Sequence, residues 1–367
     1  QGAFRELNPA DFLSREEVTL DTDQISGYLT GKTVLVTGGG GSIGSELCRQ
    51  VMRFKPGKLL IFDIYENCAY ELLMELQQKY GRDIPVTVLI GSIRDKKRLD
   101  EVFETYHPTV VFHAAAHKHV PLMEVSPAEA VKNNVLGTKN LLVSASEHDV
   151  ERFVQLSTDK AVNPTSVMGC TKRICEMLIQ TFAGNTDMKC VAVRFGNVLG
   201  SHGSVIPLFE AQIKKGGPVT LTDPNIERYF MTIPEAAQLV LQAGALAESG
   251  NIYVLDMGEP VKIMDLAKQL IRFYGYEPGV NMEIKIVGLR PGEKLYEELM
   301  MDEEQGKMRR TEHNKIFVAS PRDIDLAVFY QQLQDLAAAA QHNDEGVVDQ
   351  LEKMIPTFTP TRKNLKT

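Results

Sequence analysis

KTVLVTGGGGSIGSE, residues 32–46, decides the fold of this chain. Its first half is a short β-branched run that ends in glycines. The residues that follow repeat apolar side chains at helical spacing, namely Ile43, Leu47, Val51 and Phe54. A strand that leads through a glycine-rich turn into an amphipathic helix is the first βα unit of an α/β fold. We therefore expect further units of the same kind along the chain.

Five more apolar runs of strand length follow, with room for a helix between them: KLLIFD, PVTVLIG, TVVFHAAA, RFVQLST and KCVAVRFG. Continuous apolar runs are typical of strands that are buried on both faces. Their alternation with helices predicts an α/β protein with a parallel sheet covered on both sides. The expected fold is a Rossmann-like, doubly wound parallel sheet with a smaller C-terminal substrate-binding lobe.

The glycines of the opening stretch have a GxxGxxG spacing, formed by Gly38, Gly41 and Gly44. A backbone that approaches a pyrophosphate must turn tightly, and a helix N-terminus offers unpaired N–H groups and about half a positive charge. These glycines, with Ser42 and Ile43 between them, are predicted to bind a dinucleotide. A plain glycine turn is the alternative, but the strand, the helix and a downstream acid favour the dinucleotide.

Asp63 is that acid, and it ends the second apolar run. An acid at this place bonds the ribose hydroxyls of NAD and repels the 2'-phosphate of NADP. The following IYENC has no Arg or Lys to compensate, so the sequence favours NAD. The alternative is an aspartate that only caps the next helix.

Two other segments are expected to lie along the cofactor. Ser92 and Ile93 follow the third strand and are predicted neighbours of the adenine. The run HAAAHKHVP follows the fourth strand, where the small side chains of Ala114 and Ala115 would allow close approach.

The alternation of strands and helices also suggests where the chain divides into domains. Residues 1–30 are a polar, acidic arm, and residues 31–200 are the expected NAD-binding Rossmann domain. After residue 200 the chain becomes rich in Gly, Pro and short segments, although NIYVLDMG has the pattern of a strand. We therefore expect 228–255 to rejoin the Rossmann domain, and 201–227 with 256–367 to form the substrate-binding and C-terminal helical lobe.

Bulk composition excludes several function classes. The formal net charge of -8 argues against nucleic-acid binding, because phosphate requires a basic face. The cysteines number five and form no CxxC pair, which indicates reduced, cytosolic thiols; they are Cys48, Cys68, Cys170, Cys175 and Cys190. Neither a membrane-spanning apolar run nor a signal peptide is present. Because residue 1 is Gln, we interpret the chain as a fragment or a processed form.

The stretch STDKAVNPTSVMGCTK, residues 157–172, raises the question of chemistry. A short-chain dehydrogenase would carry a tyrosine as acid/base four residues before Lys172. This chain has Met168 there, and a thioether cannot carry a proton. Either the chemistry has been lost, or it resides on other residues, with Thr158, Asp159 and Lys160 the nearest candidates.

Both parts of this stretch have a purely structural interpretation. TDKAVNP is rich in turn formers and could be a polar turn between strand and helix. Met168 taken alone would be a core residue of a helix. Its position one helical turn from Lys172, on the same face, favours a place in the site.

Several motifs together carry a resemblance to a known family. The glycine spacing resembles the extended short-chain dehydrogenase/reductase superfamily. STDKAVNPTSVMGCTK, AAAHKHVP, VRFGNVLGSHGSVIPLF, ERYFMTIPEA and GLRPGEKLYEEL resemble the bacterial UDP-N-acetylglucosamine 4,6-dehydratases of surface-glycan biosynthesis, over residues 32–299. The arm RELNPADFLSREEVTL resembles the segment that joins the catalytic domain to a membrane-anchored N-terminal region in long members of that family.

The resemblance implies a reaction. In this family an NAD-type cofactor removes hydride from C4 of the sugar, and the 4-keto group acidifies the C5 proton. Water then leaves across C5 and C6, and the hydride returns to C6. The product is a UDP-4-keto-6-deoxy-HexNAc for bacterial surface-glycan or glycoprotein biosynthesis. The long members with Met at this position resemble enzymes that retain configuration at C5.

The steps of that reaction assign roles to the residues of the stretch. Asp159 protonates the departing 6-hydroxyl, and Lys160 takes the C5 proton if its amine is neutral. Burial and the neighbouring Lys172 are expected to depress the pKa of Lys160. Thr158 bonds the sugar 4-hydroxyl, Lys172 holds the nicotinamide ribose, and Met168 forms an apolar wall beside sugar and nicotinamide.

Four further residues are expected to contact the substrate, UDP-N-acetylglucosamine. Asn197 in GNVLG and Arg290 in LRPGEK resemble the family's diphosphate and uridine contacts, as do Arg228 in ERYF and Lys118 in HKHV. Each isolated charge could instead be a solvated surface residue. The HKH histidines have no third ligand, so no metal site is expected.

Two other functions stay open. A UDP-sugar 4-epimerase would need a tyrosine to shuttle the 4-hydroxyl proton, and Met168 counts against it. A non-catalytic dinucleotide-sensing regulator would not need the Asp159–Lys160 pair. The resemblance also implies that the full-length protein is anchored in the bacterial inner membrane with this part on the cytoplasmic side, and a homo-oligomer is compatible with the sequence.

Overall fold

The computed structural model describes residues 8–13, 15–200, 204–299, 309–319, 322–342 and 344–361 of the 367-residue chain. The first seven residues of the expected arm and parts of the expected second lobe lie outside these ranges. Among the described residues, no helix combines the length and the apolar character that crossing a membrane requires.

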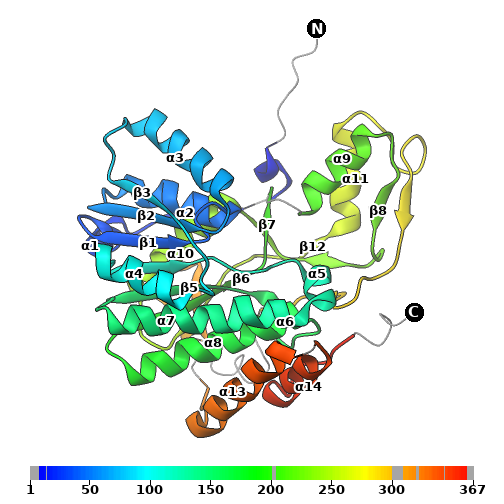
Figure 1. Ribbon diagram of the computed structural model, residues 1–367. Helices are drawn as coiled ribbons and strands as arrows, with labels where there is room; N and C mark the ends of the chain where they lie inside the picture. Colours follow the sequence, from blue (N-terminus) through cyan, green and yellow to red (C-terminus); the bar gives the residue numbers. More distant parts are fainter. Residues whose placement is uncertain are drawn as a thin grey trace.

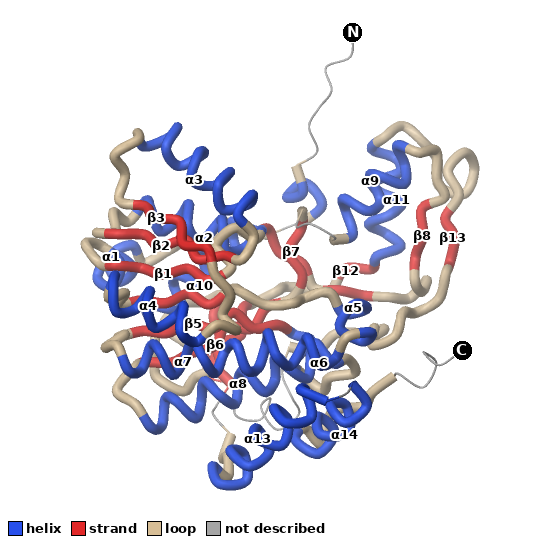
Figure 2. The backbone as a smooth tube through the Cα atoms, viewed as in Figure 1, coloured by secondary structure: helices blue, strands red, loops and turns tan. Residues whose placement is uncertain are grey.

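A nine-stranded sheet forms the centre of the described structure (Figures 1 and 2). In sheet order its strands are β3 (Val86–Ile90), β2 (Lys58–Asp63), β1 (Thr33–Thr37), β4 (Val110–His113), β5 (Arg152–Thr158), β6 (Lys189–Phe195), β11 (Ile252–Leu255), β15 (Ile316–Ala319) and β14 (Arg309–Arg310). The strands from β3 to β11 pair in parallel. This order confirms the predicted doubly wound, Rossmann-like sheet.

Helices cover both faces of this sheet. One face carries α1 (Thr22–Leu29), α2 (Ser42–Arg53), α3 (Glu66–Tyr80) and α10 (Ile233–Leu246); the other carries α4 (Lys96–Tyr106), α7 (Gly137–Glu147) and α8 (Val167–Asn185). Strand β1 shows why both faces are apolar. Leu35 belongs to one buried cluster, and Val34 and Val36 belong to the other, because successive side chains of a strand point to opposite faces.

A smaller lobe packs beside the carboxyl ends of the central strands (Figure 1). It contains α9 (Val205–Lys214) and α11 (Ile263–Phe273) around an apolar cluster that includes Phe209, Leu266 and Leu270. Three two-stranded sheets complete the region: β7 (Asn197–Leu199) with β10 (Phe230–Thr232), β8 (Val219–Leu221) with β13 (Ile284–Ile286), and β9 (Glu227–Arg228) with β12 (Val261–Lys262).

The C-terminal quarter packs differently from the expectation for 256–367. Strand β15 pairs antiparallel with β11, and so extends the central sheet. Helices α13 (Leu326–His342) and α14 (Asp344–Met354) pack on α8, on α6 (Pro127–Ala130) and on the π-helical turn η2 (Val131–Leu136). The reason is apolar burial, since Phe329 and Leu333 join the cluster beneath α8. These contacts attach the end of the chain to the Rossmann part, while the domain boundaries themselves stay a prediction.

The N-terminal arm connects the two lobes. After η1 (Pro9–Phe12), Leu13 packs on the smaller lobe, whereas Leu20 packs on the cluster around the central sheet. Between them the Arg15 guanidinium forms a mostly buried ion pair with Glu235, at 2.7 Å. The arm is thus an integrated part of the described fold.

A buried charge cluster joins the elements that surround the carboxyl end of β5. Glu176 on α8 is fully buried and pairs with Arg194 of β6 at 2.7 Å and with Arg173 at 3.0 Å. Its carboxylate also accepts a hydrogen bond from the Ser157 hydroxyl at 2.7 Å. Arg194 donates in addition to the carbonyl of Leu299 at 2.9 Å. Helix α8, strands β5 and β6 and the 290s segment are therefore tied together at one point.

We expect Glu176→Gln to lower the free energy of unfolding by about 3–5 kcal/mol, because it leaves two buried guanidinium groups without their counter-charge. Glu129→Gln is the matched control, since Glu129 pairs with Arg94 at 2.6 Å on the surface. That control should cost less than about 1 kcal/mol. Urea unfolding followed by circular dichroism measures both, and equal losses would contradict the structural role of Glu176.

Candidate active site

The glycine loop between β1 and α2 is packed too closely for any side chain. Gly38 has φ +64°, and a Cβ there would lie 2.7 Å from the backbone nitrogen of Ala115. A Cβ on Gly44 would lie 2.0 Å from the Gly38 carbonyl oxygen, so the first turn of α2 lies directly on the loop. Gly41 is the N-cap, and Ser42 begins the helix. The unpaired N–H groups of that first turn form an anion site.

Asp63 lies at the end of β2 with its carboxylate against this loop. Its two oxygens accept the backbone N–H groups of Gly40 and Tyr65, each at 2.9 Å. The second bond closes a turn before α3, whose N-cap is Tyr65, so Asp63 does not cap that helix. A carboxylate has about four acceptor positions, so two of them remain for ribose hydroxyls.

The other predicted cofactor neighbours differ in how much surface they offer. Ala114 and Ala115 follow β4 and border the glycine loop. The Ser92 hydroxyl accepts the backbone N–H of Arg94 at 3.1 Å. Ile93 is only 3% exposed and belongs to the core beneath α7, so its side chain offers little surface to an adenine.

The predicted catalytic stretch begins where β5 ends. Thr158, Asp159 and Lys160 lie consecutively at this end, where Asp159 begins the short helix η3 (Asp159–Ala161). The Thr158 hydroxyl donates to Asp159 Oδ1 at 3.2 Å and accepts the Lys160 backbone N–H at 3.2 Å. The Asp159 side chain is fully buried, while a quarter of the Lys160 side chain is exposed. The turn therefore holds an acid inside and a cation at the edge of the site.

Helix α8 is pressed against this turn. A Cβ on Gly169 would lie 2.2 Å from the Lys160 carbonyl oxygen, so only glycine permits the contact. Lys172, one turn further on, donates to the Leu156 carbonyl of β5 at 2.9 Å. Met168 is 3% exposed and lies in the apolar core, as a core helix residue would.

The charge on Lys160 differs from the sequence expectation. Burial alone would lower the pKa of Lys160, but Asp159 and Glu297 raise it by more, so its pKa is above the ordinary value. The expected influence of Lys172 is wrong, since the cation that acts on Lys160 is Arg228. The raised pKa favours the ammonium form of Lys160, whereas burial lowers the pKa of Lys172 and of Lys294.

Lys160 lies in a cluster of side chains from both lobes. Its Nζ is 3.2 Å from Glu297 Oε1, 3.2 Å from Asn197 Oδ1 and 3.5 Å from Asp159 Oδ1. Arg228 Nε is 3.1 Å from the same Glu297 oxygen. Two predicted substrate residues, Asn197 and Arg228, are thus brought together with the catalytic pair.

The surroundings of Asp159 favour its protonated form. Burial raises its pKa well above the ordinary value, and the neighbouring Glu297 raises it further. Burial would raise the pKa of Glu297 as well, but Lys160 and Arg228 outweigh it and lower that pKa to about 2. Of these two carboxyl groups, Asp159 is the acid and Glu297 is the anion.

The other two predicted substrate residues lie nearer the surface, and Arg290 is linked to the cluster through Glu293, which also pairs with Arg228. Lys118 is exposed on the loop before α5 (Val120–Val125). The Arg290 side chain is 59% exposed and lies 3.8 Å from Glu293. Both cations act on His119, because after burial they are the charges that lower its pKa. They form a second basic group at the surface.

Sequence reasoning missed Glu297 and Tyr229. Glu297 belongs to the quoted motif GLRPGEKLYEEL, but its three glutamates cannot be told apart by pattern alone. Tyr229 lies beside Asp159, and a Cβ on Gly196 would lie within 3.2 Å of both residues. Burial and the charge of Asp159 raise the pKa of Tyr229.

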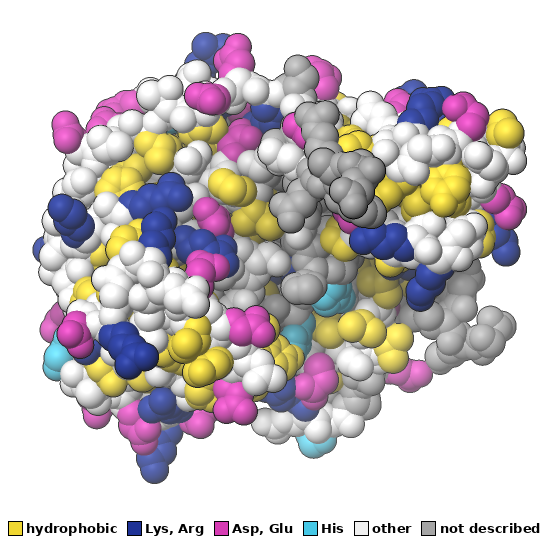
Figure 3. All heavy atoms as spheres, turned by 90° about the horizontal axis from the view of Figure 1, so that it is seen from above, with side chains coloured by type: hydrophobic (Ala, Val, Ile, Leu, Met, Phe, Trp, Pro, Cys, Tyr) yellow, Lys and Arg dark blue, Asp and Glu magenta, His cyan; other side chains and the backbone are white. Residues whose placement is uncertain are grey.

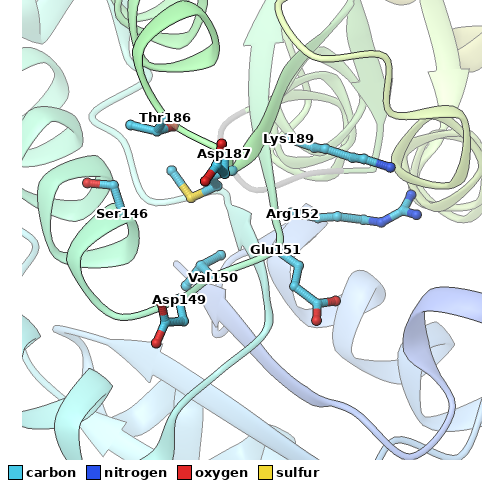
Figure 4. Close-up of a pocket in the computed structure, with 9 residues that line it drawn as sticks. Ser146, Asp149, Val150, Glu151, Arg152, Thr186, Asp187 and Lys189 are labelled. Atoms are coloured by element: carbon cyan, nitrogen blue, oxygen red, sulfur yellow. The ribbon is translucent and has the colours of Figure 1, made fainter.

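A surface cavity of about 670 Å³ lies at the opposite end of the strands (Figure 4). Its lining comes from the residues that enter β5 and β6, including Asp149, Glu151, Arg152 and Lys189. None of the predicted site residues lines it.

Charges are mixed on the outer surface as well, and Figure 3 shows basic and acidic side chains interspersed over the face seen there.

One group of possible metal ligands occurs among the described residues, away from the site. Asp100, Glu147 and His148 bring ligand atoms within 4.8 Å of one another. The ammonium of Lys96 lies 2.8 Å from Asp100 and 3.6 Å from Glu147, and so already supplies the positive charge there.

Comparison with protein families gives one match. Residues 34–321 match the family described as polysaccharide biosynthesis protein. The capsular polysaccharide biosynthesis protein CapD of Staphylococcus aureus is 56% identical over 81% of this chain and 50% of its own length. The chain thus spans about half the length of that relative.

Two further relatives have names that specify reactions. A UDP-N-acetylglucosamine 4,6-dehydratase (inverting) of Campylobacter jejuni is 34% identical over 72% of this chain and 76% of its own. A UDP-glucose 4-epimerase of Rickettsia canadensis is 32% identical over 91% of this chain and 98% of its own.

Solved structures share the fold. Pen from Bacillus thuringiensis has a TM-score of 0.74 and 35% identity, over 80% of this chain and 89% of its own. The UDP-glucose 4-epimerase of Thermus thermophilus in complex with NAD has a TM-score of 0.62 and 24% identity, over 71% of this chain and 88% of its own. The second likeness shows the fold alone.

We expect Gly169→Ala to lower the free energy of unfolding by about 1–3 kcal/mol, because the added methyl group overpacks the contact between α8 and η3. Gly184→Ala is the matched control, since Gly184 lies in the same helix and a methyl group added there would meet nothing within 4 Å. That control should be neutral or stabilising by up to about 1 kcal/mol. Urea unfolding compares the two, and equal effects would contradict the contact.

Proposed function

The chain belongs to the polysaccharide biosynthesis protein family, and from this premise we propose that it is a UDP-N-acetylglucosamine 4,6-dehydratase. The observation that carries the proposal is the buried Asp159 acid beside Lys160 at the end of β5, with Met168 where a phenol would stand. Elimination of water needs one group that donates a proton and one that accepts a proton. This pair supplies both groups within a single turn.

We assign NAD as the cofactor, because the residues present fit it. The glycine loop and the first turn of α2 would hold its diphosphate, and the two spare acceptor positions of Asp63 would hold a ribose. NAD would supply the hydride acceptor for C4 and return the hydride to C6. Lys172 would hold the nicotinamide ribose, after exchanging its bond to the Leu156 carbonyl for one to the ribose.

The residues around the sugar then divide the proton transfers. Asp159 donates its proton to the departing 6-hydroxyl, which its raised pKa permits near neutral pH. Lys160 first releases its ammonium proton to water, then takes the C5 proton and returns a proton to C5 as the hydride reaches C6, while the 4-hydroxyl proton released by the oxidation also passes to water. Thr158, which already bonds Asp159, orients the 4-hydroxyl. Asn197 and Arg228 contact the diphosphate and uridine from the smaller lobe, and Lys118 with Arg290 extends that contact at the surface.

A 4-epimerase is the second candidate, and the Rickettsia relative supports it. Position 168 holds a buried thioether that cannot shuttle a proton. Tyr229 is the phenol near Asp159, but burial and negative charges raise its pKa, which opposes a role as base. The dehydratase is therefore preferred to the epimerase.

We also propose that the full-length protein is anchored in a bacterial membrane with this part facing the cytoplasm. The support is the chain's span of half the Staphylococcus relative, together with the resemblance of its arm to a segment that follows a membrane region. Fractionation of the full-length protein tests this, and recovery in the soluble fraction would contradict it.

Incubation with UDP-N-acetylglucosamine tests the function. We expect a product lighter by one water, seen by mass spectrometry, with one deuterium at C5 when the reaction runs in heavy water. A product of unchanged mass with inverted C4 would indicate the epimerase. Tight NAD binding without any product would indicate that the protein is a non-catalytic, dinucleotide-sensing regulator.

Lys160→Met should lower turnover by about 10²–10⁴, because a positioned base is lost. Lys294→Met is the matched control, since Lys294 is also largely buried beside this turn and bonds the Val162 carbonyl. The control should retain at least about a tenth of turnover, as expected for a lysine that carries no proton step. If the Lys160→Met variant also retains at least about a tenth of turnover, Lys160 is not the base.

Asp63→Asn should narrow the preference for NAD over NADP, because the charge that repels a 2'-phosphate is removed while one amide oxygen can still accept the loop N–H. Calorimetry on protein stripped of cofactor measures both affinities. Equal or tighter binding of NADP by the unaltered protein would refute the assignment.

A further inference from the structure

Glu297 lies where both cations of the site converge. Its side chain is 2% exposed, and its Oε1 accepts from Lys160 at 3.2 Å and from Arg228 at 3.1 Å. Its other oxygen accepts from the Asn197 amide at 3.3 Å. Both cations of the cluster and one amide thus contact this carboxylate.

Asp159 has the opposite surroundings. Its Oδ1 receives the Thr158 hydroxyl at 3.2 Å and lies 3.5 Å from Lys160, which is closer to Glu297. Its Oδ2 is buried and has no hydrogen-bond partner among the described residues. The backbone of Gly196 closes over that atom, so a Cβ there would lie 3.2 Å from it. An ionised oxygen in such a place would be costly.

We propose that Glu297 is a positioning residue that keeps Asp159 in its acid form, through a single proton that Asp159 holds and donates to the Glu297 carboxylate. The bond satisfies the otherwise unpartnered Asp159 oxygen. It also explains why both cations bind Glu297, since the ionised member of the pair attracts them. The pKa directions of the two groups agree with this division.

The proposal gives the smaller lobe a role in the chemistry. Asp159 follows strand β5 of the central sheet, whereas Glu297 lies two residues before Leu299, whose carbonyl is held by Arg194. Asp159 therefore gains the acceptor for its proton only when the segment that carries Glu297 packs against the central sheet. The use of this acid to protonate a 6-hydroxyl rests on the proposed function, but the shared proton does not.

Infrared spectroscopy of the unliganded protein tests the shared proton. The difference between the unaltered protein and Asp159→Asn isolates the carbonyl stretch of a protonated Asp159 carboxyl, and selective ¹³C-aspartate confirms it. We expect this band near neutral pH. In Glu297→Gln its titration midpoint should fall by about one pH unit or more, because a like charge is removed and Lys160 is freed to pair with Asp159.

Glu293→Gln is the matched control. Glu293 also pairs with Arg228, at 3.5 Å, so its substitution removes a charge near the site without touching Asp159. We expect this substitution to leave the carbonyl band unchanged. Absence of the band in the unaltered protein, or an unshifted midpoint in Glu297→Gln, would overturn the proposal. Because no substrate is used, these results stand even if the protein proves not to be a dehydratase.

A second measurement covers the case in which Glu297→Gln does not fold. In Asp159→Asn the amide can donate to Glu297 as the carboxyl proton does, so its thermal midpoint near neutral pH should equal or exceed that of the unaltered protein. A lowered midpoint would mean that an ionised Asp159 had been paired with Lys160, and would refute the shared proton.

Discussion

The buried carboxylate of Glu176 is the constraint on which the site depends. It holds Arg194 of β6, Arg173 of α8 and the Ser157 hydroxyl of β5, all within 3.0 Å. Ser157 immediately precedes the turn of Thr158, Asp159 and Lys160, and α8 supplies Lys172, which donates to the Leu156 carbonyl of β5. Arg194 also fixes the segment that brings Glu297. One buried charge therefore sets the relative positions of three elements, and α8 then presses against the turn through Gly169.

This arrangement gives the resting site a definite charge pattern. The raised pKa of Asp159 favours its protonated form, and the raised pKa of Lys160 favours its ammonium form. A sugar nucleotide that covers the site would remove water from around Lys160, and desolvation is the effect that lowers the pKa of an amine. The base would then form only with substrate in place.

The sequence predicts what depends on neighbours along the chain. Strand runs, helical spacing and the glycines predicted the parallel sheet and the loop of Gly38 and Gly44 because these signals are local. It could not predict that β15 joins the central sheet, that Ile93 is buried, or that Glu297 meets Lys160, since these depend on contacts between segments that are far apart in the sequence. The wrong expectation for Lys160 has the same cause: the cation near it is Arg228, from the other lobe.

The central claim is that this site oxidises C4, eliminates water and returns the same hydride to C6. UDP-N-acetylglucosamine labelled with deuterium at C4 tests it directly, with the product analysed by NMR after a single turnover. The account predicts that the label is found at C6 of a 4-keto-6-deoxy sugar. Label that remains at C4 of a sugar with its 6-hydroxyl intact would contradict the account.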